Sequence, residues 1–250
     1  MKKYILFGLL AFGCSHKESV ENDDVVSETV ESPMETDAKA VEKTGKLVYE
    51  ENLDRNLKAV ADKVRVYELD WKNDKDSEGA GNLEYRIEFI KSGKVVKDFS
   101  GKIDTDRGAE WSVNSKVIQT SETEYDSRFL EVSTGYAACG YVWNHFLFFV
   151  DANEIQQVLT NYSMMDSGFG TSYEFFPTME SGKATKFSMV KVNVDEAETS
   201  SEESTVLEIA YSDSTDYSLE NGKWRGNRVT PKEKVYRKKV VSFDDYYKSE

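Results

Sequence analysis

The sequence predicts a mainly β protein, an antiparallel sandwich or open barrel of about ten strands with one N-terminal helix. Three observations support this prediction. Aromatic residues make up 12% of the 250 residues and only 3 are proline. Aromatic and β-branched residues favour strands. Apolar and polar residues alternate over several stretches, and two-residue turns that contain glycine separate those stretches.

The first element that the sequence predicts is a helix from Asn52 to Lys63. Its apolar residues recur at the spacing of one helix face, and Lys58 and Lys63 lie toward its C-terminal end, where the helix dipole favours cations. We therefore expect this helix to pack against a sheet. The residues of the face are Leu53, Leu57, Val60 and Val64.

Beyond residue 80 the apolar period changes from helical to two, which is typical of half-buried strands. The first alternating strand carries Leu83, Tyr85, Ile87 and Phe89 on one face. Three short Ser-Gly or Asn-Gly connections predict β-hairpins, because glycine tolerates the positive φ that such turns require. These connections are Lys91–Lys94, Glu180–Lys183 and Glu220–Lys223.

The most apolar stretch runs from Thr134 to Asp151 and is apolar on both faces. A strand without a polar face must be covered on both sides, so it is predicted to be central in its sheet. A turn at Asp151–Glu154 leads into a strand at Ile155–Leu159. The glycine-rich Ser167–Gly170 is expected to be a loop or bulge. Later strands carry Leu207, Ile209 and Tyr211, and finally Tyr236, Val240 and Phe243.

Residues 1–13 have the pattern of an export signal peptide. The basic Met1-Lys2-Lys3 precedes nine apolar residues, Tyr4–Phe12, which are too few to span a membrane. Gly13-Cys14 then follows, and this junction resembles the lipobox of bacterial lipoproteins. The resemblance covers only the first fourteen residues. Ala11 and Phe12 depart from the usual lipobox pattern.

The resemblance implies that Cys14 is acylated and anchors the mature chain in a membrane. By the common sorting rule, Ser15 after the cysteine implies the outer membrane. An alternative remains open, because Ala11-Phe12-Gly13 also suits ordinary signal peptidase. The protein would then be secreted or periplasmic and soluble.

Residues 14–46 are predicted to be an acidic, disordered tether, and residues 47–250 a β-rich globular domain. Ser15–Gly45 contains nine acidic residues and no aromatic residue, so it cannot bury enough surface to fold alone. Loss of residues 1–13 removes two lysines and changes the net charge from −14 to −16. This charge argues against nucleic acid and against electrostatic binding to anionic lipid. The only membrane partner expected is the one reached through the lipid anchor.

One basic region contrasts with the overall negative charge. Between residues 225 and 239 the chain has seven basic residues and one acid, Glu233. These cations either pair with acids of the same protein or form a patch for an anionic partner. The predicted patch comprises Arg225, Arg228, Lys234, Arg237, Lys238 and Lys239.

Cys139 and His145 are candidates for a nucleophile and its general base. Cys139 and His145 share a face, but six residues of strand separate them by about 20 Å. With His16 in the tether, the two histidines argue against a metal site or catalytic triad. Cys139 is expected to be a buried thiol, and it has no disulfide partner if Cys14 is acylated.

The remaining candidates are acidic or aromatic. Asp74–Gly79 resembles the start of a calcium loop but has Tyr85 where a bidentate acid is needed, so a solvated loop is expected. The acidic run from Asp195 to Glu203 is expected to be an exposed loop, with a weak cation site as the alternative. Three tryptophans are either core residues or stacking surfaces for sugars. These are Trp111, Trp143 and Trp224.

The sequence contains no P-loop, GxSxG, HExxH or CxxC motif, and it predicts no cofactor and no catalytic residue. The leading hypothesis is a lipid-anchored cell-envelope protein that binds a partner protein or an envelope glycan. The alternatives are a carboxylate-based polysaccharide hydrolase and a structural subunit of an envelope assembly.

The lipobox resemblance makes a direct prediction about Cys14. Cells grown with labelled palmitate should incorporate label into this protein, and Cys14→Ala should abolish the labelling. A wild-type protein that carries no label, or that is found free in the medium, would contradict the anchor.

Overall fold

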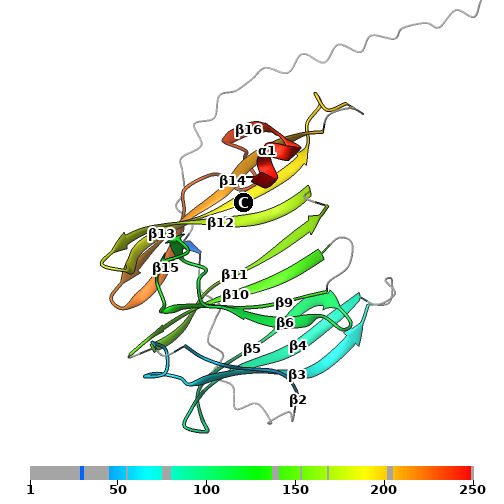
Figure 1. The fold of residues 1–250 in the computed structure, drawn as a ribbon. Helices are drawn as coiled ribbons and strands as arrows, with labels where there is room; N and C mark the ends of the chain where they lie inside the picture. The colour runs from blue at the N-terminus through cyan, green and yellow to red at the C-terminus, as the bar shows by residue number, and fades with distance from the viewer. Residues whose placement is uncertain are drawn as a thin grey trace, which may run out of the picture.

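Antiparallel strands form nearly all of the described structure, which confirms the predicted mainly β class (Figure 1). The computed structural model describes residues 29–30, 45–54, 56–74, 80–136, 141–152, 154–167, 169–201 and 205–248. Within these ranges the strands form a large sheet, a small sheet and one short hairpin. None of the helices within them is long and apolar enough to cross a membrane.

The large sheet has ten strands in the order β1-β15-β14-β13-β12-β11-β10-β9-β6, with β16 also paired to β14. Its strands are β1 (Thr29–Val30), β6 (Glu110–Asn114), β9 (Phe129–Gly135), β10 (Tyr141–Asp151), β11 (Glu154–Asp166), β12 (Phe169–Glu180), β13 (Lys183–Glu196), β14 (Val206–Glu220), β15 (Lys223–Arg228) and β16 (Arg237–Ser242).

The small sheet has four strands in chain order, β2 (Lys46–Asn52), β3 (Lys63–Asn73), β4 (Ala80–Lys91) and β5 (Lys94–Asp106). The hairpin consists of β7 (Gln119–Ser121) and β8 (Glu124–Tyr125), and the last described element is a short helix, α1 (Phe243–Lys248). In Figure 1 the small sheet lies at the bottom of the molecule, and β16 and α1 lie at the top.

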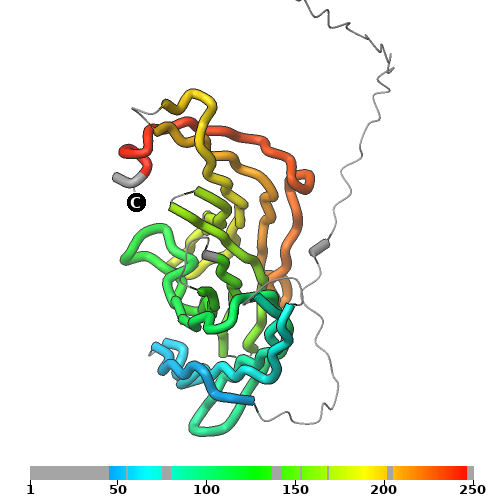
Figure 2. Tube along the Cα trace, turned by 90° about the vertical axis from the view of Figure 1, so that its right-hand side faces the viewer, coloured from blue at the N-terminus to red at the C-terminus, as the bar shows by residue number. Residues whose placement is uncertain are grey.

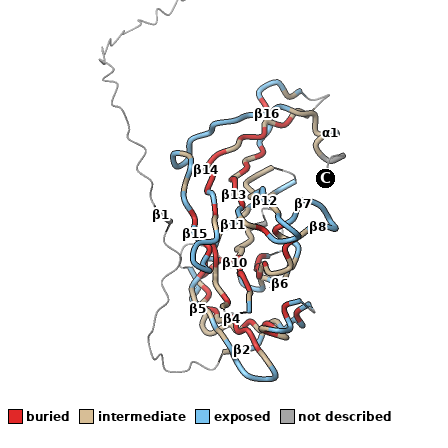
Figure 3. The backbone as a smooth tube through the Cα atoms, turned by 90° about the vertical axis from the view of Figure 1, so that its left-hand side faces the viewer, coloured by how far each residue is buried: buried red, intermediate tan, exposed pale blue. Residues whose placement is uncertain are grey.

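The small sheet packs against one face of β9 and β10 and forms a two-layer sandwich with them. Phe146, Phe148 and Val150 of β10 point into this layer. The Phe148 ring lies 5.2 Å from Phe89 of β4, and Phe146 lies 4.9 Å from Tyr85. Figure 3 shows the buried residues concentrated along β10 and along the strands that cover it.

The opposite face of β10 is also buried, so the predicted central strand is confirmed. Leu147 and Phe149 point away from the small sheet into a second core. Phe129 of β9 and Phe187 of β13 join this core. Trp224 of β15 is 1% exposed there, with its ring 5.8 Å from Phe149.

A curl of the large sheet creates this second core. Figure 2 shows the sheet bending so that its C-terminal strands arch over its middle. Gln156 of β11 secures the curl, because its side-chain amide donates to the Trp224 carbonyl and accepts from the Trp224 N–H, both at 2.8 Å. β15 thus returns to β11 without pairing to it, and the sheet is a curled open sheet, not a closed barrel.

All three predicted hairpin turns are confirmed. Ser92 and Gly93 join β4 to β5 with φ of 50° and 79°, and the other two turns have the same pattern. Two successive positive φ values define the type I′ turn, whose twist matches that of paired strands. The other turn residues are Ser181, Gly182, Asn221 and Gly222.

The predicted N-terminal helix is wrong. Asn52 ends β2 and Lys63 begins β3, and the chain between them makes only a short turn. Leu53 and Leu57 are nevertheless buried, at 3% and 2% exposure. The spacing identified the buried side chains, but a loop can bury the same set. Main-chain bonds from Leu53 to Asp62 and from Asp62 to Ile90 hold this loop on the sheet.

The end of the chain also differs from prediction. Phe243 was expected in the last strand but begins α1. Ser242 ends β16 and acts as the helix N-cap, since its Oγ accepts the Asp245 N–H at 3.1 Å and donates to the Asp245 carboxylate at 2.7 Å. Within the range predicted to be the tether, Thr29–Val30 pairs antiparallel with the edge strand β15.

Gly170, at the junction of β11 and β12, is predicted not to tolerate a side chain. Gly170 has φ of 136°, and a Cβ there would lie 1.9 Å from the Met164 carbonyl oxygen. Gly170→Ala should lower the free energy of unfolding by about 3 kcal/mol in urea titration. The control is Gly93→Ala, which also has positive φ but an open surrounding, and should lower it by about 1 kcal/mol. Equal losses would show that the Gly170 contact is relieved elsewhere.

Candidate functional site

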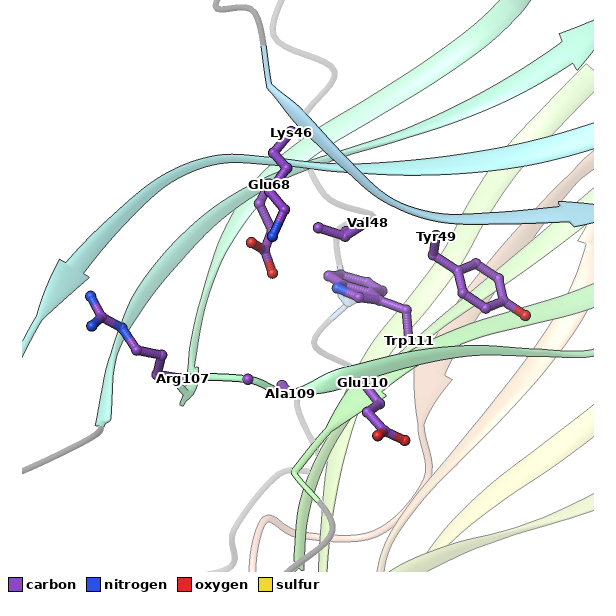
Figure 4. Close-up of a pocket in the computed structure, with 9 residues that line it drawn as sticks. Lys46, Val48, Tyr49, Glu68, Arg107, Ala109, Glu110 and Trp111 are labelled. Carbon is purple, nitrogen blue, oxygen red and sulfur yellow. The ribbon is translucent and has the colours of Figure 1, made fainter.

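The candidate site is a cavity of about 540 Å³ where the edges of the two sheets approach each other. β2 is the edge strand of the small sheet, and β6 is the edge strand of the large sheet. Figure 4 shows Lys46, Val48 and Glu68 on the small-sheet side, with the Trp111 indole between them and the turn at Arg107–Ala109.

The turn between β5 and β6 shapes the floor of this pocket. Here the chain leaves the small sheet and enters the large one. Gly108 has φ of 89°, and the Ala109 N–H donates to the Asp106 carbonyl at 3.3 Å. Glycine suits the left-handed backbone at this position. On the other wall, Lys46 of β2 lies directly opposite Glu68 of β3 in the strand register.

Trp111 forms the inner wall of the pocket. It is 7% exposed, and its ring stacks 6.2 Å from Phe146 at 19°. Its indole Nε1 is buried and has no hydrogen-bond acceptor among the described residues. A buried donor without an acceptor costs about 1–3 kcal/mol. Any acceptor group that entered the pocket and reached this N–H would remove that penalty.

The two cations of the pocket are not neutralised within the described structure. Neither Lys46 nor Arg107 has a carboxylate oxygen within 4 Å there. The Arg107 guanidinium instead lies 5.9 Å from the centre of the Trp71 ring. In contrast, Glu50, which is also on β2, forms ion pairs with both Lys63 and Arg65. The hydrogen bond that Lys63 donates to Glu50 is the main cause of the lowered pKa of Glu50.

Two further lining residues are directed elsewhere. Tyr49 donates its hydroxyl to Glu51 Oε2 at 3.0 Å. Burial, followed by this bond and the Glu51 charge, raises the pKa of Tyr49 to about 12, so the phenol stays protonated at neutral pH. Glu110 points away from the cavity in Figure 4. The remaining polar groups that line the pocket are therefore Lys46, Glu68, Arg107 and the Trp111 edge, and Figure 4 shows the Arg107 guanidinium directed away from Trp111.

The structure divides the predicted basic patch between two faces of the sheet. The registers of β15 and β16 on β14 place Arg225, Arg237 and Lys239 on one face. Arg228 and Lys238 are on the other face, and Lys234 lies in the connecting loop. Neighbouring residues of a strand point in opposite directions, so a cluster in the sequence does not form one surface here.

Three of these six cations have an acidic or aromatic contact partner. Lys238 pairs with Glu208 at 2.6 Å, and this bond raises the Lys238 pKa. Arg228 pairs with Asp213 at 3.4 Å. Arg237 lies 4.9 Å over the Tyr211 ring. Burial raises the pKa of Glu174, while the charges of Arg237 and Lys239 oppose that rise. This pattern favours the interpretation that the region pairs with the protein's own acids.

The three tryptophans have different positions. Trp224 is a core residue, which leaves it unable to stack with a sugar. Trp111 lines the pocket, and Trp143 lies half-buried on β10. A Cβ at Gly135 would be 2.4 Å from the Trp143 ring, so that glycine allows the indole to approach the β9 backbone closely.

Several predicted sites lie outside the described residues. These are Cys14, His16, Cys139 and most of the Asp74–Gly79 loop. Asp195, Glu196 and Glu198 of the acidic run are described, and Glu202 and Glu203 are not. The part of the chain that the structure describes contains no group of three His, Cys, Asp or Glu residues that could hold a metal ion.

Sequence reasoning missed Lys46, Glu68 and Arg107 as site residues. They come from three separate segments, and only the fold brings them together. Their one local signal is the Arg107-Gly108 turn between two strands, which marks a change of direction but not a site.

The fold and the pocket define a two-sheet, mainly β protein with a small polar site between its sheet edges. No protein-family model matches the chain, and no curated protein sequence or solved structure matches it.

The hydrogen bond from Tyr49 to Glu51 predicts how the pKa of Tyr49 responds to mutation. Glu51→Gln should lower the pKa of Tyr49 but leave it above 10, because burial is the larger cause and is retained. Unfolded tyrosine ionises near 10, so the stability contributed by Tyr49 is present below about pH 10 and is lost as the pH rises toward 12. Absorbance titration of tyrosinate, with Tyr49→Phe as the reference, measures this pKa. An unchanged value in Glu51→Gln would contradict the assigned cause.

Proposed function

We propose that this protein is a lipid-anchored cell-envelope protein whose β domain binds an anionic envelope glycan in the pocket between β2 and β6. The observation that carries the proposal is the set of unsatisfied groups around one cavity. These groups are the buried Trp111 N–H and the two cations without counter-ions, Lys46 and Arg107, all within the described residues.

The pocket groups match the chemistry of an acidic sugar. Lys46 and Arg107 supply positive charge for a carboxylate, and a guanidinium binds carboxylates in a bidentate manner. Glu68 can accept hydrogen bonds from sugar hydroxyls. Val48 offers apolar surface to a ring face. The Trp111 N–H can donate to a ring or hydroxyl oxygen.

The size of the cavity favours a small ligand over a protein surface. Pockets for small molecules are about 300–1,000 Å³, and this one is about 540 Å³. A stable protein interface needs about 800 Å² from each partner. A carboxylate-based polysaccharide hydrolase receives less support, because Glu174 has the one raised carboxyl pKa among the described residues and it does not line the pocket.

The cellular location in this proposal comes from the N-terminal sequence. Cys14 carries the lipid, the acidic segment after it separates the domain from the membrane, and Ser15 directs the protein to the outer membrane. A secreted or periplasmic soluble protein is the alternative, and the binding function is the same in both cases.

Calorimetric titration with an oligogalacturonate, a short chain of uronic acid units, tests whether the pocket binds an acidic glycan. Wild-type protein should bind it. Arg107→Ala and Lys46→Ala should each weaken binding by about tenfold to a hundredfold, as expected for loss of a charged hydrogen bond. Trp111→Phe, which removes the N–H, should weaken it by about tenfold.

Lys94→Ala is the matched control, because Lys94 is an exposed lysine at the β4–β5 turn and does not line the pocket. Its binding constant should equal that of wild type. Equal weakening by Lys94→Ala and Lys46→Ala would indicate nonspecific charge attraction and would overturn the proposal. A wild-type protein that does not bind the oligogalacturonate would also overturn the proposal.

A further inference from the structure

Three polar residues on adjacent strands form a connected chain on the face of the large sheet away from the small sheet. They are Glu131 of β9, His145 of β10 and Ser163 of β11. The strand registers place Ser163 opposite Trp143 and Glu131 opposite Leu147, one row to either side of His145. The three side chains therefore follow a diagonal across three neighbouring strands.

The distances between these side chains are short. His145 Nε2 lies 2.8 Å from Ser163 Oγ. His145 Nδ1 lies 3.2 Å from Glu131 Oε1, although the N–H is too poorly aligned for a hydrogen bond. Catalytic contacts of this kind are often misaligned before a substrate binds. The carboxylate beside Nδ1 favours the tautomer with its proton there, which leaves Nε2 to accept the Ser163 proton.

The three groups are half-buried. The side chains of His145 and Glu131 are 21% and 14% exposed, and Ser163 is also partly exposed. Partial burial strengthens electrostatic contacts while a substrate can still reach the serine. This arrangement meets the general requirement for an activated nucleophile, which is a serine at hydrogen-bond distance from a base that a third group orients.

We propose that Ser163 is a nucleophile, with His145 as its general base and Glu131 as the positioning residue, and that this face hydrolyses carboxylic esters of small acyl groups. The activity is separate from glycan binding in the pocket, which lies at the β2 and β6 edges. A test of the esterase activity therefore has an outcome that does not depend on whether the pocket binds a glycan.

The reaction needs only ester and water. Ser163 Oγ attacks the carbonyl carbon as its proton passes to His145 Nε2. The bond to the alcohol oxygen breaks, and that oxygen takes the proton from His145. Water then attacks the acyl-serine, His145 again accepts a proton, and the carboxylic acid leaves as Ser163 recovers its hydrogen.

The surroundings of Ser163 suit an acyl group. Trp143 lies directly opposite Ser163 in the register, and its ring rests on Gly135. Leu147 and Leu159 pair further along the same face. Asn161, opposite His145, has an amide whose Nδ2 contacts only the Met189 sulfur at 3.5 Å, among the described residues. Since sulfur is a weak acceptor, this amide is a donor that this face offers to a developing oxyanion.

A fluorophosphonate probe tests the nucleophile on the full chain. Its phosphorus bonds to Ser163 Oγ, fluoride leaves, and the proton passes to His145. Peptide mass analysis should find the label on Ser163. Ser163→Ala should abolish labelling, and His145→Gln should reduce its rate by about a hundredfold. Ser112→Ala is the matched control, because this exposed serine is on the same face but bonds to Ser133.

Glu131 requires a test that separates positioning from stability. Glu131→Gln should slow labelling, and Glu131→Asp, which keeps the charge, should restore part of the rate. Circular dichroism and the thermal midpoint should stay close to wild type in both variants. Wild-type protein that is folded but unlabelled, a label on another serine, or equal rates in Glu131→Gln and wild type would overturn the proposal.

Discussion

The fold depends on the need to bury both faces of β10. Phe146 and Phe148 alternate with Leu147 and Phe149, so no orientation of this strand exposes a polar face. Burying such aromatic side chains stabilises the fold by about 1.5–3 kcal/mol each. Two separate covers are therefore required. The small sheet is one, and the curled C-terminal half of the large sheet is the other.

Each cover creates one candidate site. The small sheet meets the large sheet along β10 but leaves a gap at the edge strands β2 and β6, where Trp111 closes the core and its N–H is left without an acceptor within the described structure. The curl covers the other side of β10, where His145 remains partly exposed. The curl is held by Gln156, whose side-chain amide bonds to the main chain of Trp224. These two bonds take the place of strand pairing between β11 and β15.

Charge is distributed differently in the two halves of the molecule. On β14–β16 the cations lie on both sheet faces and have partners such as Glu208 and Asp213. The exposed Lys238–Glu208 pair contributes little stability, but such pairs offset positive charge that an anionic ligand would need. Lys46 and Arg107, which are far apart in the sequence, line one pocket, and no carboxylate oxygen of the described residues lies within 4 Å of either.

The sequence by itself determined the β class, the three hairpins and the central strand, because turn chemistry and two-residue periodicity are local properties. It also identified Leu53 and Leu57 as buried, yet it predicted a helix, since burial spacing alone cannot distinguish a helix from a loop held by Asp62. Only the tertiary structure decided which residues share a site. Glu131, His145 and Ser163 belong to three strands, and Lys46 and Arg107 lie on opposite sides of the sandwich gap. Strand register and sheet curl set such contacts, and neither is written in local sequence.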